Sequence, residues 1–119
     1  LEVNGLKVVS GGGSIKWNKS GETYYWQPGG KRDGTTRYFE FTTDVAGTVT
    51  VYSSNTGGSE DLTRMVTVKV GDADPESLPG GTPSGDAPTK NDFSVSAGTV
   101  KIYPTGNGLR FYKIEFHSL

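Results

Sequence analysis

The sequence has no cysteine and only one histidine, His117, close to its last residue. The absence of cysteine excludes disulfide bonds, thiolate zinc sites and cysteine nucleophiles. A catalytic triad would depend on His117, and no Gly-x-Ser-x-Gly elbow, Walker motif or dinucleotide-binding glycine pattern occurs. The sequence therefore predicts a protein that is not an enzyme.

Long apolar runs are also missing: none approaches the roughly 18 residues of a membrane-spanning helix, and no signal peptide is visible. Neither sign of charge dominates, since 12 Lys and Arg oppose 13 Asp and Glu, which excludes a nucleic-acid-binding protein built on bulk positive charge. The charges are unevenly spread, with a net +2 over residues 1–43, −5 over 44–92 and +2 over 93–119. A local cationic surface is therefore compatible with an acidic protein.

Glycine is abundant, with 18 residues, and only 32% of the chain is hydrophobic, a composition that disfavours a helical bundle. Short segments alternate apolar and polar residues between turn-forming residues, which is typical of β-strands. They are Leu6–Ser10, Ser14–Trp17, Glu22–Trp26, Arg37–Thr43, Thr48–Ser53, Arg64–Val70, Asp92–Val95, Thr99–Tyr103 and Leu109–His117. We expect an all-β protein, an antiparallel β-sandwich resembling a jelly roll, with about nine short strands and no significant helix. Residues 1–119 would form a single domain, with a long Gly- and Pro-rich surface loop at 71–90.

One segment is repeated: Ala46–Tyr52 reads AGTVTVY, and Ala97–Tyr103 reads AGTVKIY. The two copies are either similar strands that obey the same alternation, or equivalent hairpins that lie in different sheets or side by side. Both interpretations favour an all-β fold.

The end of the chain predicts a hairpin, because Gly106-Asn107-Gly108 can form a three-residue loop. The register that keeps apolar residues on one face pairs Ile102 with Tyr112, Tyr103 with Phe111, and Lys101 with Lys113. Two directly opposed lysines repel each other. Their repulsion would be offset either by a carboxylate such as Glu115 or Glu40, or by an anionic ligand.

Alternating carboxylates at Asp72, Asp74 and Glu76 are the one candidate for a metal site. Oxygen ligands in a loop could hold a structural Ca²⁺, although the spacing is not that of an EF-hand. The alternative is a solvated acidic loop. No other cofactor is expected.

Aromatic and basic residues gather in two places. The first group contains Lys16, Trp17, Lys19, Tyr24, Tyr25, Trp26, Lys31 and Arg32, and the second contains Lys101, Tyr103, Arg110, Phe111 and Lys113. Aromatic rings can stack on sugar rings, and Lys and Arg can bind carboxylates through charge-assisted hydrogen bonds. Core packing is the alternative role for Trp17 and Trp26.

Three segments carry a resemblance to a known family. Arg37–Thr42, Ala46–Tyr52 and the ending Ala97–Tyr103 with Leu109–Phe116 resemble carbohydrate-binding module family 77, β-sandwich modules attached to bacterial pectate lyases. The resemblance implies a non-catalytic, monomeric module of a secreted bacterial enzyme that binds homogalacturonan of low esterification, an acidic pectin, through basic side chains. It also implies a covalently linked catalytic domain and no membrane or nucleic-acid partner. The expected ligand-binding residues are Lys16, Lys31, Lys101, Lys113, Arg32, Lys90, Trp26 and Tyr103.

Two other functions remain open from the sequence. A module for a neutral glycan would use Trp17, Trp26 or Tyr25 as a stacking platform. A structural β-sandwich domain would bind no sugar, and its lysines would only be solvated.

Overall fold

The computed structural model describes residues 2–3, 6–10, 15–20, 23–28, 37–55, 63–80, 88–106 and 109–119, with side chains from Tyr38 onward. The strands are β1 (Glu2–Val3), β2 (Leu6–Ser10), β3 (Ile15–Ser20), β4 (Thr23–Pro28), β5 (Arg37–Thr43), β6 (Gly47–Asn55), β7 (Met65–Val70), β8 (Glu76–Pro79), β9 (Thr89–Val95), β10 (Gly98–Thr105) and β11 (Leu109–Ser118). These described residues include no helix, and so none that could cross a membrane. The protein is all-β, as the sequence predicts.

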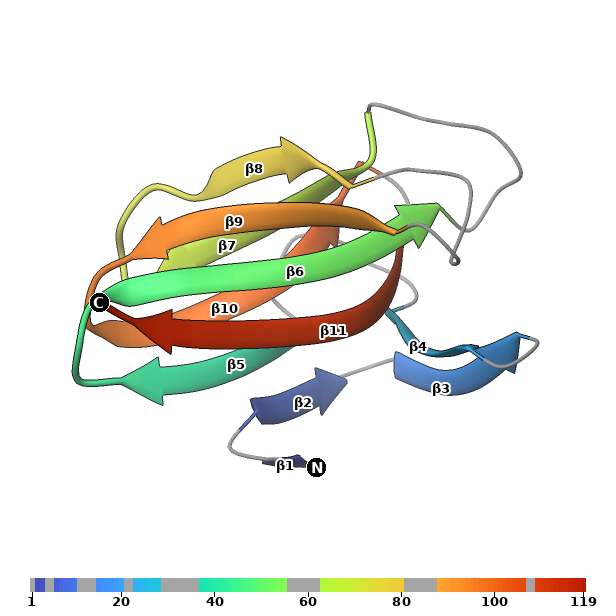
Figure 1. The fold of residues 1–119 in the computed structure, drawn as a ribbon, viewed down its shortest axis with the longest axis horizontal. Helices are drawn as coiled ribbons and strands as arrows, with labels where there is room; N and C mark the ends of the chain where they lie inside the picture. The colour runs from blue at the N-terminus through green and yellow to red at the C-terminus, as the bar shows by residue number, and fades with distance from the viewer. Residues whose placement is uncertain are drawn as a thin grey trace.

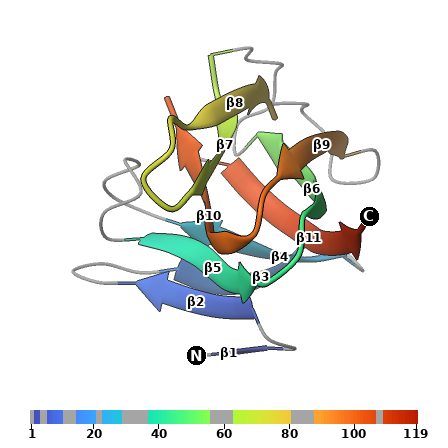
Figure 2. The same cartoon turned by 90° about the vertical axis from the view of Figure 1, so that its left-hand side faces the viewer.

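The strands form two antiparallel sheets. Sheet A has the order β1-β2-β5-β10-β7-β8, and sheet B has the order β3-β4-β11-β6-β9. Figure 1 shows β9, β6 and β11 as one layer in front of β7, β10 and β5. Figure 2 shows the chain crossing between the layers from β5 to β6 and from β9 to β10.

The hydrophobic core lies between the sheets and takes side chains from both. Sheet A supplies Phe39, Val66, Val68, Val100 and Ile102, and sheet B supplies Val49, Val51, Phe93, Val95, Leu109 and Phe111. The rings of Phe39 and Phe111 meet across the sheets with their centroids 5.3 Å apart. The period-two alternation of the sequence thus becomes one buried face on each sheet.

The repeated segments form one central strand in each sheet, β6 in sheet B and β10 in sheet A. Their equivalent residues Val49, Val51, Val100 and Ile102 are all fully buried. The interpretation as two similar strands that obey the same alternation therefore holds, with one strand in each sheet. The copies do not open equivalent hairpins, because the strands that follow them in sequence lie in the opposite sheet.

The predicted hairpin at the end of the chain is wrong. Strand β10 pairs with β5 and β7, whereas β11 pairs with β4 and β6, so the register of Lys101 with Lys113 does not exist. Phe111, expected on the solvent face, is 1% exposed. The prediction failed because it assumed that strands adjacent in sequence pair with each other, whereas this connection crosses from sheet A to sheet B.

The predicted number of nine strands is not confirmed, and the segment 71–90 is not one continuous loop. It contains β8, and β9 begins at Thr89. Gly80, directly after β8, is buried: its amide donates to the Arg64 carbonyl, and its own carbonyl accepts a 2.9 Å hydrogen bond from Ser53 Oγ. Hydrogen bonds therefore connect the residue after β8 to Arg64, which precedes β7 of sheet A, and to Ser53 on β6 of sheet B.

Substitution of Gly80 by alanine tests this packing. A Cβ at Gly80 would lie 2.6 Å from both Ser53 Oγ and Val66 Cγ2, so we expect Gly80→Ala to lower the free energy of unfolding by about 1–3 kcal/mol. Urea denaturation measures this change. As a control, Gly71→Asn should change it much less, because no atom lies within 4 Å of a Cβ there and asparagine tolerates the positive φ of 53°. An unchanged midpoint for Gly80→Ala would contradict the packing.

Candidate functional site

The solvent face of sheet B carries two of the predicted lysines in one ladder row. Lys113 on β11 lies opposite Tyr52 on β6, and Tyr52 lies opposite Lys90 on β9. Two strand spacings separate the lysines, which places their backbones about 10 Å apart. The side chain of Lys113 is 61% exposed, Lys90 is exposed and Tyr52 is half-buried between them.

A β-bulge in β11 adds further groups to this row. Phe111 lies opposite Ser53 and Lys113 opposite Tyr52, so Tyr112 is an extra residue in the ladder. The bulge allows Phe111 to enter the core while Lys113 points to solvent. We call Lys90, Arg110 and Lys113, together with Tyr52 and Tyr112, the basic patch. Such bulges often re-aim side chains at functional sites.

Hydrogen bonding holds the bulged residue in place. The hydroxyl groups of Tyr112 and Ser54 are 2.7 Å apart, and Arg110 lies opposite Ser54 in the ladder. Lys113 Nζ is 5.7 Å from the centroid of the Tyr52 ring. The patch thus combines three cationic side chains with two tyrosines on three adjacent strands.

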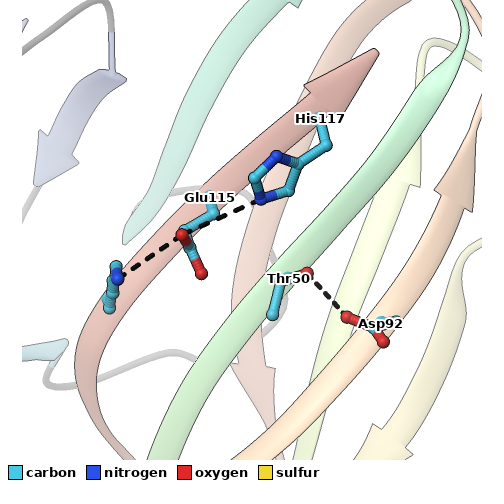
Figure 3. A network of polar contacts seen from close by, with 5 residues as sticks. Thr50, Asp92, Glu115 and His117 are labelled. Atoms are coloured by element: carbon cyan, nitrogen blue, oxygen red, sulfur yellow. Dashed lines mark hydrogen bonds and ion pairs between the residues drawn. The ribbon is translucent and has the colours of Figure 1, made fainter. Parts of the chain in front are cut away.

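The carboxylates of this face lie in the next row of the ladder, where Glu115 and Asp92 flank Thr50. Thr50 Oγ1 donates a 2.6 Å hydrogen bond to Asp92 Oδ1. Glu115 Oε2 is 3.4 Å from Lys113 Nζ and 3.8 Å from His117 Nε2; Figure 3 shows Glu115 reaching His117, and Thr50 reaching Asp92. The acidic row is about 7 Å along the strands from the Tyr52 row, so within the described part of the chain the basic end of the face is by the bulge.

Of the acidic groups that the structure describes, Glu115 is the closest to the patch, and its pKa is lowered. Partial burial of the carboxyl opposes ionisation, but the hydrogen bond from Tyr52 and the charges of Lys113 and His117 outweigh it and lower the pKa below its usual range. Glu115 therefore stays ionised and competes for Lys113 with any external anion.

Lys16 and Trp26 belong to the same sheet but farther along it. Lys16 on β3 lies opposite Gln27, and Trp26 on β4 lies opposite both Trp17 and Phe111. The side chains of Lys16 and Trp26 are outside the described part of the structure. Lys31 and Arg32 lie outside the described residues altogether.

Lys101 and Tyr103 lie in the other sheet, so the second predicted group does not share one face. Tyr103 is 6% exposed and presents little surface to a ligand. Lys101 lies opposite Glu40 on one side and Lys69 on the other, and its Nζ is 4.4 Å from the Tyr38 ring centroid. The predicted pairing of Lys101 with Lys113 is wrong: the lysine opposite Lys101 is Lys69.

The candidate calcium ligands do not form a metal-binding group. Asp72, Asp74 and Glu76 are exposed, and no cluster of three or more His, Cys, Asp or Glu side chains able to hold a metal ion occurs among the described residues. We assign no metal to this turn.

Sequence reasoning missed the roles of Tyr52 and Tyr112. A signal was present, since the apolar residues of β11 change parity, from Leu109 and Phe111 to Ile114 and Phe116. A change of parity within one strand indicates a bulge. It would have placed Phe111 in the core and Lys113 on the solvent face.

Compared with known proteins, the chain matches no protein-family model and no curated protein.

The pKa of Glu115 gives a test of this site. Carboxyl NMR titration should show a midpoint below that of an unfolded reference peptide, and Lys113→Gln should move it upward by removing the ion pair and its charge. Because the folded pKa is depressed, the stabilisation from Glu115 is present above the unfolded pKa and is lost as the pH falls through the folded pKa. Lys90→Gln, on the other side of Tyr52, should leave the midpoint almost unchanged. A wild-type midpoint at or above the reference would refute the arrangement.

Proposed function

We propose that the protein is a non-catalytic carbohydrate-binding module, a jelly-roll-like β-sandwich that binds acidic pectin through the basic patch of sheet B. The observation that supports this most is the row in which Lys90 and Lys113 flank Tyr52, with Arg110 beside it and the carboxylates one row away. Together with the family resemblance, this pattern favours homogalacturonan of low esterification, whose carboxylates recur along the chain.

The chemistry of the patch suits such a polymer. Lysine and arginine side chains form charge-assisted hydrogen bonds with carboxylates, and a tyrosine ring can pack against the apolar side of a sugar ring. Each exposed ion pair contributes only about 0–1 kcal/mol, so several contacts along one chain are required. Binding would be modest in affinity and sensitive to salt.

A module of this kind acts by tethering. A catalytic domain linked to it, such as a pectate lyase of a secreted bacterial enzyme, would be held near plant cell-wall substrate at a high effective concentration. The module itself would need no cofactor and would work as a monomer. Lys16 would extend the site across β4 to β3 of the same sheet. Trp26 lies opposite Phe111, which enters the core, so we leave it out of the site.

Affinity electrophoresis in gels that contain polygalacturonate tests the function. We expect the wild-type protein to be retarded at low salt and not at about 1 M NaCl, where the Debye length is about 3 Å. The double substitution Lys90→Gln with Lys113→Gln should weaken binding roughly tenfold, as expected from two ion pairs. Lys90→Arg with Lys113→Arg, which keeps both charges, should restore it.

Other outcomes point to the alternative functions. Equal retention by fully methyl-esterified pectin would exclude recognition of carboxylates. Retention by a neutral glycan that is unaffected by salt and lost in Tyr52→Ala would favour a stacking module. Migration unaffected by every polysaccharide would favour a structural domain.

Substitution of Glu115 should change the affinity in the opposite direction to substitution of the lysines. Because this carboxylate occupies Lys113 in the free protein, Glu115→Gln should increase the affinity for polygalacturonate. Asp44→Asn is the matched control, since it makes the same change in net charge at an exposed turn outside the patch. Equal effects of the two substitutions in the same gels would show that only net charge matters and would count against the site.

A further inference from the structure

Two lysines face each other on the solvent side of sheet A, the face opposite to the basic patch. Lys101 on β10 and Lys69 on β7 are directly opposed in the antiparallel ladder, and both are half-buried. Like charges in such positions destabilise a sheet. A group that relieves this repulsion would therefore bind there with a gain that isolated surface lysines do not provide.

The sheet itself offsets this repulsion only in part. Glu40 lies opposite Lys101 on the other side, and the Tyr38 ring lies 4.4 Å from Lys101 Nζ. Among the described residues, no acidic side chain forms an ion pair with Lys69 or Lys101. The same row continues to Lys7, which lies opposite Glu40, and ends at Glu2, which lies opposite Lys7, so three lysine and two glutamate positions cross five strands.

Neighbouring rows define the extent of this surface. On one side, the hydroxyl groups of Thr42 and Thr99 are 3.2 Å apart and exposed. On the other side, Tyr103 and Thr67 are 6% and 2% exposed. The accessible part of the face is therefore the lysine row and the threonine row beside it, where Lys69 and Lys101 are adjacent and the two glutamate positions of the row lie on β5 and β1.

We propose that the Lys69–Lys101 row is a second site for the carboxylates of an acidic polysaccharide, so that one molecule bridges two polymer chains. This inference rests on the proposed function, since it takes the same ligand class. Lys69–Lys101 and the basic patch lie on the outer faces of different sheets, and the core lies between them. A short segment of polymer bound to one face cannot reach the other, so occupation of both faces links separate chains.

A capture experiment tests the bridge. Polygalacturonate is immobilised on beads, the protein is bound at low salt and unbound protein is removed, and a short fluorescent oligogalacturonide is then added. We expect protein-loaded beads to retain the fluorescent chain. Lys69→Gln with Lys101→Gln should still bind the beads, more weakly, but should lose the capture, and Lys69→Arg with Lys101→Arg should recover it.

The outcomes separate this proposal from the proposed function. Protein bound to the beads without capture would overturn the second site and leave the first intact. Capture that persists in the Lys69→Gln, Lys101→Gln variant would also overturn it and would indicate self-association. If Lys90→Gln with Lys113→Gln binds the beads as the wild type does, the basic patch is wrong and only the sheet A site remains. Absence of any binding would refute both.

Discussion

Burial of Phe111 against Phe39 is the contact on which the basic patch depends. The two rings join β11 of sheet B to β5 of sheet A, and truncation of such a buried phenylalanine typically costs about 3–5 kcal/mol. Farther along β11, Ile114 and Phe116 also pack against the core. A regular strand cannot turn Phe111 and Ile114 to the same side, so the core requires the bulge. The bulge in turn leaves Lys113 exposed to solvent, next in sequence to the half-buried Tyr112 and close to the half-buried Arg110.

The capacity of sheet B to bind an anion depends on which charged side chains share a row of the ladder, and not on the net charge of the protein. The net charge of −1 gives no reason to expect a polyanion as partner. On sheet B, however, the cations lie by the bulge and the carboxylates lie one row away, where Thr50, Lys113 and His117 engage them. The ion pair with Glu115 lowers the charge that Lys113 offers to a ligand. The net charge of the side chains in one ladder row is therefore a better guide to anion binding than the net charge of the whole protein.

Much of the fold could be predicted from the sequence, because alternation is a local signal. The bounds of β2 and β5 were predicted to the residue, and strands were expected wherever β3 to β7 and β9 to β11 occur. Strands β1 and β8 were missed because they are only two and four residues long. Pairing was not predictable in the same way, since it depends on which connections cross between sheets. The short turns after Thr43 and Val95 change sheets, yet nothing in their composition distinguishes them from hairpin turns.

The same crossings explain why the candidate site was predicted only in part. Lys101 and Lys113 are twelve positions apart and look like neighbours in a hairpin, but the connection from β10 to β11 sends them to opposite faces of the molecule. Each lysine then meets a partner far away in sequence: Lys101 meets Lys69, and Lys113 lies in the row of Lys90. The alternation of sheets along the chain thus distributes one basic sequence segment over two surfaces. A polymer contacted by both lysines would have to approach from both sides, which a single groove does not allow.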